Sequence, residues 1–231
     1  MSEQELGVPT RRLARLVGEL ALITAGVLLA LMADAAWDSR QERAQERDYL
    51  QSLRSEMLAA RAEFDSDVAT RATHRAVLDS LSRELEQRNA ADSIVVAWLR
   101  VANTLSSVFF PPTAVFDDLV SSGNLRLIRS DGVRFALMEY AQHSPRLRFA
   151  EGREQALIEN QLFPYVVGTI DLTRDDPRAG EVDALLSSLS FRGLLAERQQ
   201  RLEAIMFWAR PVGESLDRVI EMLEADETPA S

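Results

Sequence analysis

The stretch that decides the fold is Leu20-Ala-Leu-Ile-Thr-Ala-Gly-Val-Leu-Leu-Ala-Leu-Met-Ala33, an uninterrupted apolar run near the start of the chain. As a helix it spans only ~21 Å, which is short of the ~30 Å hydrocarbon core of a bilayer. Extending it to residues 16–37 gives roughly 33 Å and includes Glu19 and Asp34, near the two interfaces, where a carboxylate costs less than at the midplane. We therefore expect residues 16–37 to form a transmembrane helix in the lipid bilayer.

Four residues at the ends of this segment form a candidate membrane-helix contact: Arg15, Glu19, Asp34 and Trp37. Arg15 precedes Glu19 by one turn and can pair with it, and Trp37 is placed like an interfacial aromatic anchor. Glu19 and Asp34 share a broad helix face, because 15 residues bring the helix round to within roughly 60° of its start. Either this face meets a partner helix, as in a homo-oligomer, or the acids mark the wet ends of the segment.

Two other readings of the apolar run stay open. Arg11, Arg12 and Arg15 followed by Ala33-Asp34-Ala35 also resemble a signal peptide with a cleavage site near Ala35. Apolar runs of this length also occur in the core helices of soluble proteins. A signal anchor is favoured because the helical pattern continues past Trp37. Arginines are equally frequent on both sides of the apolar run, so their number does not decide the orientation. We expect the commoner orientation in the inner membrane, with the N-terminus cytoplasmic and the main domain periplasmic.

Residues 38–90 follow as a long charged helix or stalk, because no proline or glycine interrupts residues 38–89. Asp67, Arg71 and His74 fall on the same heptad track as the apolar residues, so we expect the apolar seam either to break there or to shift, through Val68 and Ala72. The stripe predicts either a coiled coil that dimerises or a helix that packs on its own chain. Its apolar members are Leu50, Leu53, Met57, Ala60, Phe64, Leu78, Leu81 and Leu85.

Acid-before-base pairs at i, i+4 spacing are typical of an exposed helix face. Three occur in the stalk, and we expect all of them in solvent: Asp67–Arg71, Asp79–Arg83 and Glu84–Arg88.

The rest of the chain is predicted to be a helical bundle over residues 91–225, after a short basic tail at 1–15 and before a disordered tail at 226–231. Residues 113–143 should form a helical hairpin, with Thr113 capping its first helix, and with Gly123 and Asn124 in its turn. Separate helices are expected over residues 147–162 and 191–223. No alternating strand pattern is convincing, so the fold class is all-α.

The composition removes several kinds of chemistry. The chain has no cysteine and no lysine, so it lacks a thiol nucleophile, a Schiff-base lysine and a phosphate-loop lysine. A net charge of −10 argues against a nucleic-acid partner. His74 and His143 are the only histidines; we expect His74 to be solvated or to line the stripe, and His143 to lie beside the terminal carbonyls of a helix.

The paired acids do not predict a metal site. Asp117 and Asp118 diverge by about 100° on a helix, and Asp175-Asp176 before Pro177 is typical of a turn. We therefore expect no cofactor, no metal and no catalytic residue.

Two stretches carry a resemblance: Glu19–Arg40 with Glu46-Arg-Asp-Tyr-Leu50, and Thr113-Ala-Val-Phe-Asp-Asp-Leu-Val-Ser-Ser-Gly-Asn-Leu-Arg-Leu-Ile-Arg129. They resemble a family of uncharacterised bacterial single-pass membrane proteins, catalogued only as a domain of unknown function. The resemblance implies an N-terminal anchor, a charged helix and a helical hairpin around the Ser-Gly-Asn-Leu turn. It implies no activity.

These observations favour a non-enzymatic, membrane-anchored helical interaction or sensory module. Its expected partners are the lipid bilayer and either another protein or a second copy, bound through the membrane helix or the stalk. The alternative is an exported helical enzyme that uses carboxylates and is released by signal-peptide cleavage near Ala35.

Overall fold

The computed structural model describes residues 10–104 and 108–227, and for residues 10–18 and 21 it describes the backbone alone. All regular structure in the described residues is helical, which confirms the all-α prediction. The helices are α1 (Thr10–Gln87), α2 (Asp92–Ala102), α3 (Ala114–Ser121), the short η1 (Asn124–Leu127), α4 (Asp131–Leu157), the π-helical η2 (Ile158–Leu162), α5 (Phe163–Thr169), α6 (Glu181–Ser187) and α7 (Leu189–Glu227).

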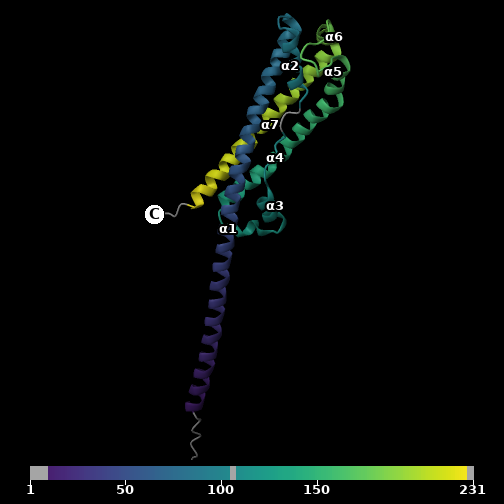
Figure 1. Ribbon diagram of the computed structural model, residues 1–231. Helices are drawn as coiled ribbons and strands as arrows, with labels where there is room; N and C mark the ends of the chain where they lie inside the picture. Colours follow the sequence, from purple (N-terminus) through teal and green to yellow (C-terminus); the bar gives the residue numbers. More distant parts are fainter. Residues whose placement is uncertain (1–9, 105–107, 228–231) are drawn as a thin grey trace, which may run out of the picture. The chain divides into compact units, whose positions relative to one another are not determined.

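The chain divides into two compact units, Met1–Tyr49 and Leu50–Ser231. In the first, the described residues all belong to α1. The second is a helical bundle in which the remainder of α1 is one of the long helices (Figure 1). Helix residues 50–87, predicted as part of a stalk, therefore belong to the same compact unit as the helices that follow them.

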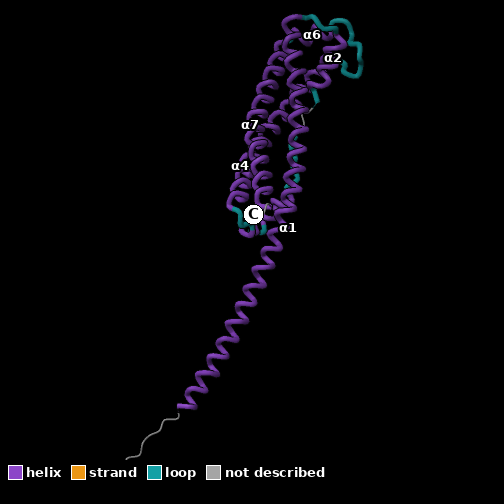
Figure 2. The backbone as a smooth tube through the Cα atoms, turned by 90° about the vertical axis from the view of Figure 1, so that its left-hand side faces the viewer, coloured by secondary structure: helices purple, strands orange, loops and turns teal. Residues whose placement is uncertain are grey.

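Three long helices lie side by side in the bundle: the α1 residues from Leu50 onward, α4 and α7 (Figures 1 and 2). Helix α7 is antiparallel to α1, as ion pairs along their contact show. Arg54 lies 3.4 Å from Glu224, and Arg61 lies 3.2 Å from Asp217. Helix α3 lies at the end of the bundle where the chain enters, and α2, α5 and α6 lie at the opposite end (Figure 1).

The apolar stripe of α1 packs on its own chain. Leu53, Met57 and Leu81 are fully buried, so the intrachain reading of the stripe is the one that the bundle realises. Of the two expectations for its middle, the shift is wrong, because Val68 is exposed. The apolar seam breaks instead, since Asp67, Arg71 and His74 stay buried on the original track. One face of α1, with three or four residues in every two turns, packs on the bundle throughout. Polar side chains occupy the middle of that face.

One glycine permits the close approach of α7 to α1. A Cβ at Gly213 would lie 2.9 Å from Cε1 of Phe64, closer than real Cβ atoms come to another carbon. The carbonyl oxygen of Gly213 also accepts a hydrogen bond of 3.2 Å from Nη1 of Arg61. The glycine is therefore required by interhelical packing, and not by a turn.

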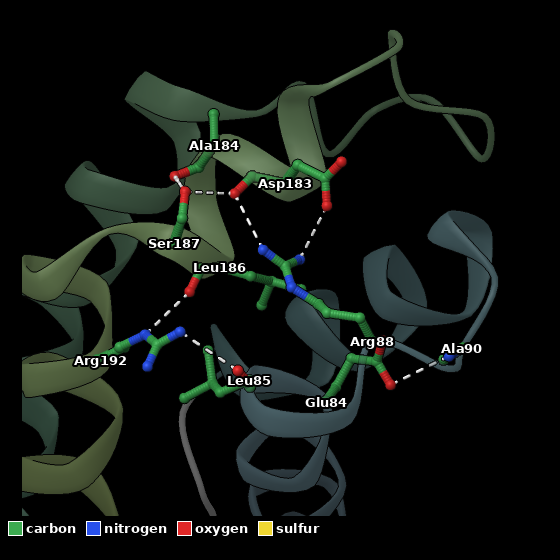
Figure 3. Close-up of polar contacts among 9 residues, drawn as sticks. All are labelled: Glu84, Leu85, Arg88, Ala90, Asp183, Ala184, Leu186, Ser187 and Arg192. Atoms are coloured by element: carbon green, nitrogen blue, oxygen red, sulfur yellow. Dashed lines mark hydrogen bonds and ion pairs between the residues drawn. The ribbon is translucent and has the colours of Figure 1, made fainter.

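Two side chains at the end of α1 bind groups that lie beyond the helix (Figure 3). Arg88 follows the helix in the left-handed region, with φ of 51°, and its guanidinium pairs with Asp183 of α6 at 3.1 Å. The carboxylate of Glu84 accepts a hydrogen bond of 3.1 Å from the backbone N–H of Ala90 (Figure 3). The predicted Glu84–Arg88 pair is therefore wrong, because each side chain has a partner beyond the helix end.

Arg192 joins three elements at the same end of the bundle. From the first turn of α7 it donates to the carbonyl oxygen of Leu85 in α1 at 3.2 Å, and to that of Leu186 in α6 at 3.1 Å (Figure 3). Carbonyls near helix ends have no partner within the helix, so an arginine is an effective cap for them.

Helix α4 is continuous where two helices were expected. It runs through Pro145 to Leu157, although a proline removes one backbone donor. The hydroxyl of Ser144 donates to the carbonyl oxygen of Tyr140 at 2.8 Å, which gives an additional bond next to the missing one. His143 is consequently a half-buried residue in the middle of a helix, and the predicted position at a helix end is wrong.

Candidate functional site

The first compact unit carries an apolar helix surface that no described part of the chain covers. Every side chain described from Glu19 to Trp37 is exposed. Among the described helices, α1 alone is long and apolar enough to cross a membrane; its most apolar 18 residues have a mean hydropathy of 1.4, and none of them is buried. The alternative of a core helix is therefore contradicted. The hydroxyl of Thr24, the one polar side chain in residues 20–33, donates to the carbonyl oxygen of Leu20 at 2.8 Å.

The four predicted contact residues all lie in this helix. Glu19, Asp34 and Trp37 are on its surface, and Arg15 falls in the part where only the backbone is described. Their contact with a partner helix stays a prediction.

The second unit contains a group of charged and polar side chains that were not predicted to meet, which we call the buried ionic cluster. It consists of Asp67, Arg71 and His74 of α1, Glu151 and Glu154 of α4, and Arg198 of α7. Each is at most 6% exposed. Charges are this deeply buried only when they are paired and hydrogen-bonded.

Its first half is centred on Arg71, which pairs with Glu151 and lies 3.8 Å from Asp67. The same Glu151 carboxylate accepts a hydrogen bond of 3.3 Å from the backbone N–H of Phe109. The predicted Asp67–Arg71 pair thus exists, but it lies in the core and not in solvent. In the core each charge is desolvated and therefore depends on its partner.

Its second half is centred on Arg198. The guanidinium lies 3.4 Å from Glu154, and Nη2 donates to Nδ1 of His74 at 3.0 Å and to the carbonyl oxygen of Thr104 at 3.1 Å. An arginine can only donate, so Nδ1 of His74 accepts, and the ring is the neutral tautomer with its proton on Nε2. With a neutral His74, the cluster holds three carboxylates against two guanidinium groups.

Burial of the cluster shifts the pKa values of its members Glu151 and His74. Burial raises the pKa of Glu151 to about 7, against the opposing effects of Arg71 and of the Phe109 N–H. Burial, and then the charge of Arg198, lower the pKa of His74. A proton on Glu151 would remove the excess negative charge without breaking its contact with Arg71, since a protonated carboxyl still accepts hydrogen bonds.

We expect the free energy of unfolding to decrease between pH 6 and pH 8. Glu151 has a folded pKa above its unfolded value, so its contribution is complete below about 4.5 and is lost as the pH rises through about 7. His74 has a lowered folded pKa, so its contribution is lost only as the pH falls below about 6.5. Glu151→Gln should therefore flatten the decrease, which over this pH range is on the order of 1 kcal/mol.

Denaturant unfolding of the full chain at pH 6, 7 and 8, followed by circular dichroism, measures this dependence. Glu159→Gln, at an exposed position of η2, is the control and should retain the wild-type slope. Equal slopes for Glu151→Gln and the wild type would disprove the assignment of the slope to Glu151.

The predicted hairpin exists, but its first helix is not capped by Thr113. The hydroxyl of Thr113 donates to Asp117 at 2.8 Å, and the backbone N–H groups of Val115 and Phe116 bond to the carboxylate of Glu56 in α1, at 2.7 and 3.2 Å. A charged acceptor from a neighbouring helix replaces the expected local cap. Gly123 ends the turn as predicted, with φ of 73°, and Asn124 begins η1.

Glu56→Gln should destabilise the hairpin by roughly 1–3 kcal/mol, because one charge-assisted hydrogen bond is lost and the amide N–H₂ faces a backbone donor. Amide hydrogen exchange at Val115 and Phe116 should become at least about fivefold faster. Glu86→Gln, at an exposed position of α1, is the control and should leave both exchange rates unchanged. Unchanged exchange in Glu56→Gln would show that the carboxylate does not hold the hairpin.

The bundle surface has shallow hollows. One of about 660 Å³ lies between α3, η1 and α4, where Phe116, Val120, Leu125, Phe135 and Met138 line it. Another, of about 270 Å³, lies between α4 and α7, with Phe149, Arg153, Arg201 and Trp208 in its walls. Neither is lined by the buried ionic cluster.

The remaining acids of interest have structural contacts. Asp175 pairs with Arg100 at 2.6 Å, and Arg100 also donates to the carbonyl oxygens of Leu172 and Arg174, so the pair holds the loop before α6. Asp117 lies in the first turn of α3, and Asp118 is exposed. In the described part of the chain, no group of three or more histidine, aspartate or glutamate side chains is arranged to hold a metal ion.

The sequence contained one signal for the buried ionic cluster, the polar residues on the apolar track of α1. They had indicated a change in the apolar seam and not a buried cluster. Glu151, Glu154 and Arg198 gave no signal, because their partners are 44 to 124 residues away along the chain. The bundle and the exposed apolar helix define an all-α protein in which one helix among the described residues is long and apolar enough to cross a membrane. No family model, no curated protein and no solved structure matches the chain.

Proposed function

We propose that the protein is a single-pass, membrane-anchored helical interaction module of the inner membrane. The observation that carries the proposal is the uncovered apolar surface of α1 between Leu20 and Met32. Eight large apolar side chains there are more than half exposed: Leu20, Leu22, Ile23, Val27, Leu28, Leu29, Leu31 and Met32. Transferring them from water to hydrocarbon is favourable by on the order of 10 kcal/mol.

The continuity of α1 supports retention of this segment. The helix passes through Ala33-Asp34-Ala35 and Trp37 without a break and continues into the bundle. The hydroxyl of Thr24 has its acceptor within the same helix, which suits a lipid environment, because a hydroxyl without a partner is costly there. In this proposal the N-terminus is cytoplasmic and the bundle is periplasmic.

The bundle supports a binding role more than a catalytic one. Three of its titratable groups with shifted pKa values, His74, Glu151 and Arg198, are enclosed in the buried ionic cluster, where a substrate has no access. The larger of the two hollows is shallow and mostly apolar. We assign the bundle the task of presenting a helical surface to a partner. In a sensory protein, this surface would report whether the partner is bound.

Flotation and mass spectrometry of the full chain test the proposal together. The protein should float with vesicles through a density gradient, resist alkaline carbonate extraction and keep its N-terminal residues in the intact mass. Accumulation in the soluble fraction would refute the anchor, and an N-terminus near Ala35 would establish the released form instead.

A further inference from the structure

One face of α4 carries an exposed stripe with the spacing of a coiled-coil seam. We call this stripe the α4 seam. Its members follow one another at alternating intervals of three and four residues, and each is exposed: Phe135, Met138, Gln142, Pro145, Phe149, Gly152 and Ala156. The stripe covers three heptads, or ~32 Å of helix.

The other face of α4 is already used by the bundle. Val133, Leu137, Tyr140, Leu147 and Leu157 are buried there. In contrast, Phe135, Met138 and Phe149 are each more than 60% exposed, although the burial of an aromatic or methionine side chain is worth about 2 kcal/mol. Aligned large apolar side chains in solvent are typical of a surface that a partner covers.

The form of the stripe indicates a helix as the partner. It is only two residues wide per heptad, the width of a coiled-coil seam, whereas a helix that lies on a membrane has a broad apolar face. The two hollows lie along it: Phe135 and Met138 line the larger one, and Phe149 lines the smaller one. Gln142 lies inside the seam, where a single polar residue sets the register of two helices.

The charges beside the seam indicate an acidic partner. Arg146, Arg148 and Arg153 flank its second half, and among the residues that the structure describes none of the three has a carboxylate within ion-pair distance. Arg146 lies over the ring of Trp208, 5.3 Å from its centroid. This basic rim belongs to a chain with a net charge of −10. A second copy would bring the same arginines to a twofold contact, where like charges repel.

We propose that the α4 seam binds an amphipathic helix of a partner protein whose apolar stripe is flanked by glutamate or aspartate. This deepens the proposed function and rests on it, because it names the surface and the kind of partner of the interaction module. The predicted contact through the membrane helix is independent of it.

The test uses the full chain in nanodiscs of neutral lipid and a fluorescent synthetic helix of four heptads, with leucine at a and d and glutamate at e and g. A matched helix has lysine in place of glutamate. The absence of native cysteine lets Gln142→Cys be trapped selectively by a helix with one cysteine at a central a position. The glutamate helix should bind at least tenfold more tightly than the lysine helix, and the disulfide should form with it.

Charge reversal separates recognition from misfolding. Arg146→Glu combined with Arg153→Glu should invert the preference, so that the lysine helix binds more tightly. Phe149→Ser should weaken binding of the glutamate helix at least tenfold, and Phe163→Ser, at an exposed aromatic outside the seam, should leave it unchanged.

Equal binding of the two helices, or a preference that the charge reversal leaves in place, would overturn the proposal. So would a dimer that Phe149→Ser dissociates, which would assign the seam to a second copy, or binding to anionic vesicles alone, which would assign it to lipid. Flotation of the same samples reports on the anchor separately, and if the chain does not float, the helix-binding assay is done on the soluble protein.

Discussion

Replacing Arg198 with methionine should lower the free energy of unfolding by roughly 3–5 kcal/mol, because it removes the guanidinium that lies against the buried carboxylate of Glu154. Arg198 is fully buried and is the only cation that the described structure places against both Glu154 and His74. Methionine fills a similar volume, so most of the loss is electrostatic. Denaturant unfolding followed by circular dichroism measures the loss.

The second variant of this experiment is Arg198→Met with Glu154→Gln. It should recover part of the loss, since the buried negative charge at residue 154 is removed together with the guanidinium. The deficit of Arg198→Met should also shrink toward pH 5, because a protonated His74 then lies near Glu154. Arg210→Met, at an exposed position of the same helix, should change the stability by less than about 0.5 kcal/mol. If Arg198→Met unfolds like this control, the buried pair does not stabilise the bundle.

Replacing both Leu28 and Leu29 with arginine should release the chain from the membrane. Each arginine near the centre of a transmembrane helix costs about 2.5–3.5 kcal/mol, so the pair reduces the partition into lipid by at least about a thousandfold. Both leucines are exposed in the first compact unit, so the variant leaves the bundle core intact. Flotation through a density gradient measures the result and separates membrane-bound protein from aggregate.

Leu58→Arg is the control for this change. Leu58 lies on the same helix and is 44% exposed, but it belongs to the second compact unit, so its replacement should leave flotation unchanged. Retention of the double-arginine variant in the floating fraction would contradict the proposed anchor.

Local patterns were sufficient for the helices and for much of the core. The recurrence of Leu50, Leu53, Met57, Ala60 and Phe64 at helical spacing predicted the buried face of α1, and all five are buried. The prediction at Gly123 was confirmed for a similar reason: a left-handed residue after a short helix is a local requirement.

Predictions that depended on a partner's identity were less successful. Thr113 was expected to cap α3. Instead, the backbone N–H of Val115 donates to Glu56, which precedes Val115 by 59 residues. The apolar stripe of α1 was expected to break or to shift at Arg71, because an isolated charge is costly in a core. A glutamate 80 residues away removes that cost, and the spacing along α1 contains no information about it.

By itself the sequence determined that the chain is helical, that residues 20–33 are an apolar helical segment, and which side of α1 is buried around residues 50–64, because helix formation and amphipathicity depend on residues within a few turns. Only the tertiary structure decided that Asp67, Arg71 and His74 meet Glu151, Glu154 and Arg198, and that one face of α4 stays open. The physical reason is that the charge of a buried group is compensated by neighbours in space, and packing selects those neighbours from distant parts of the chain.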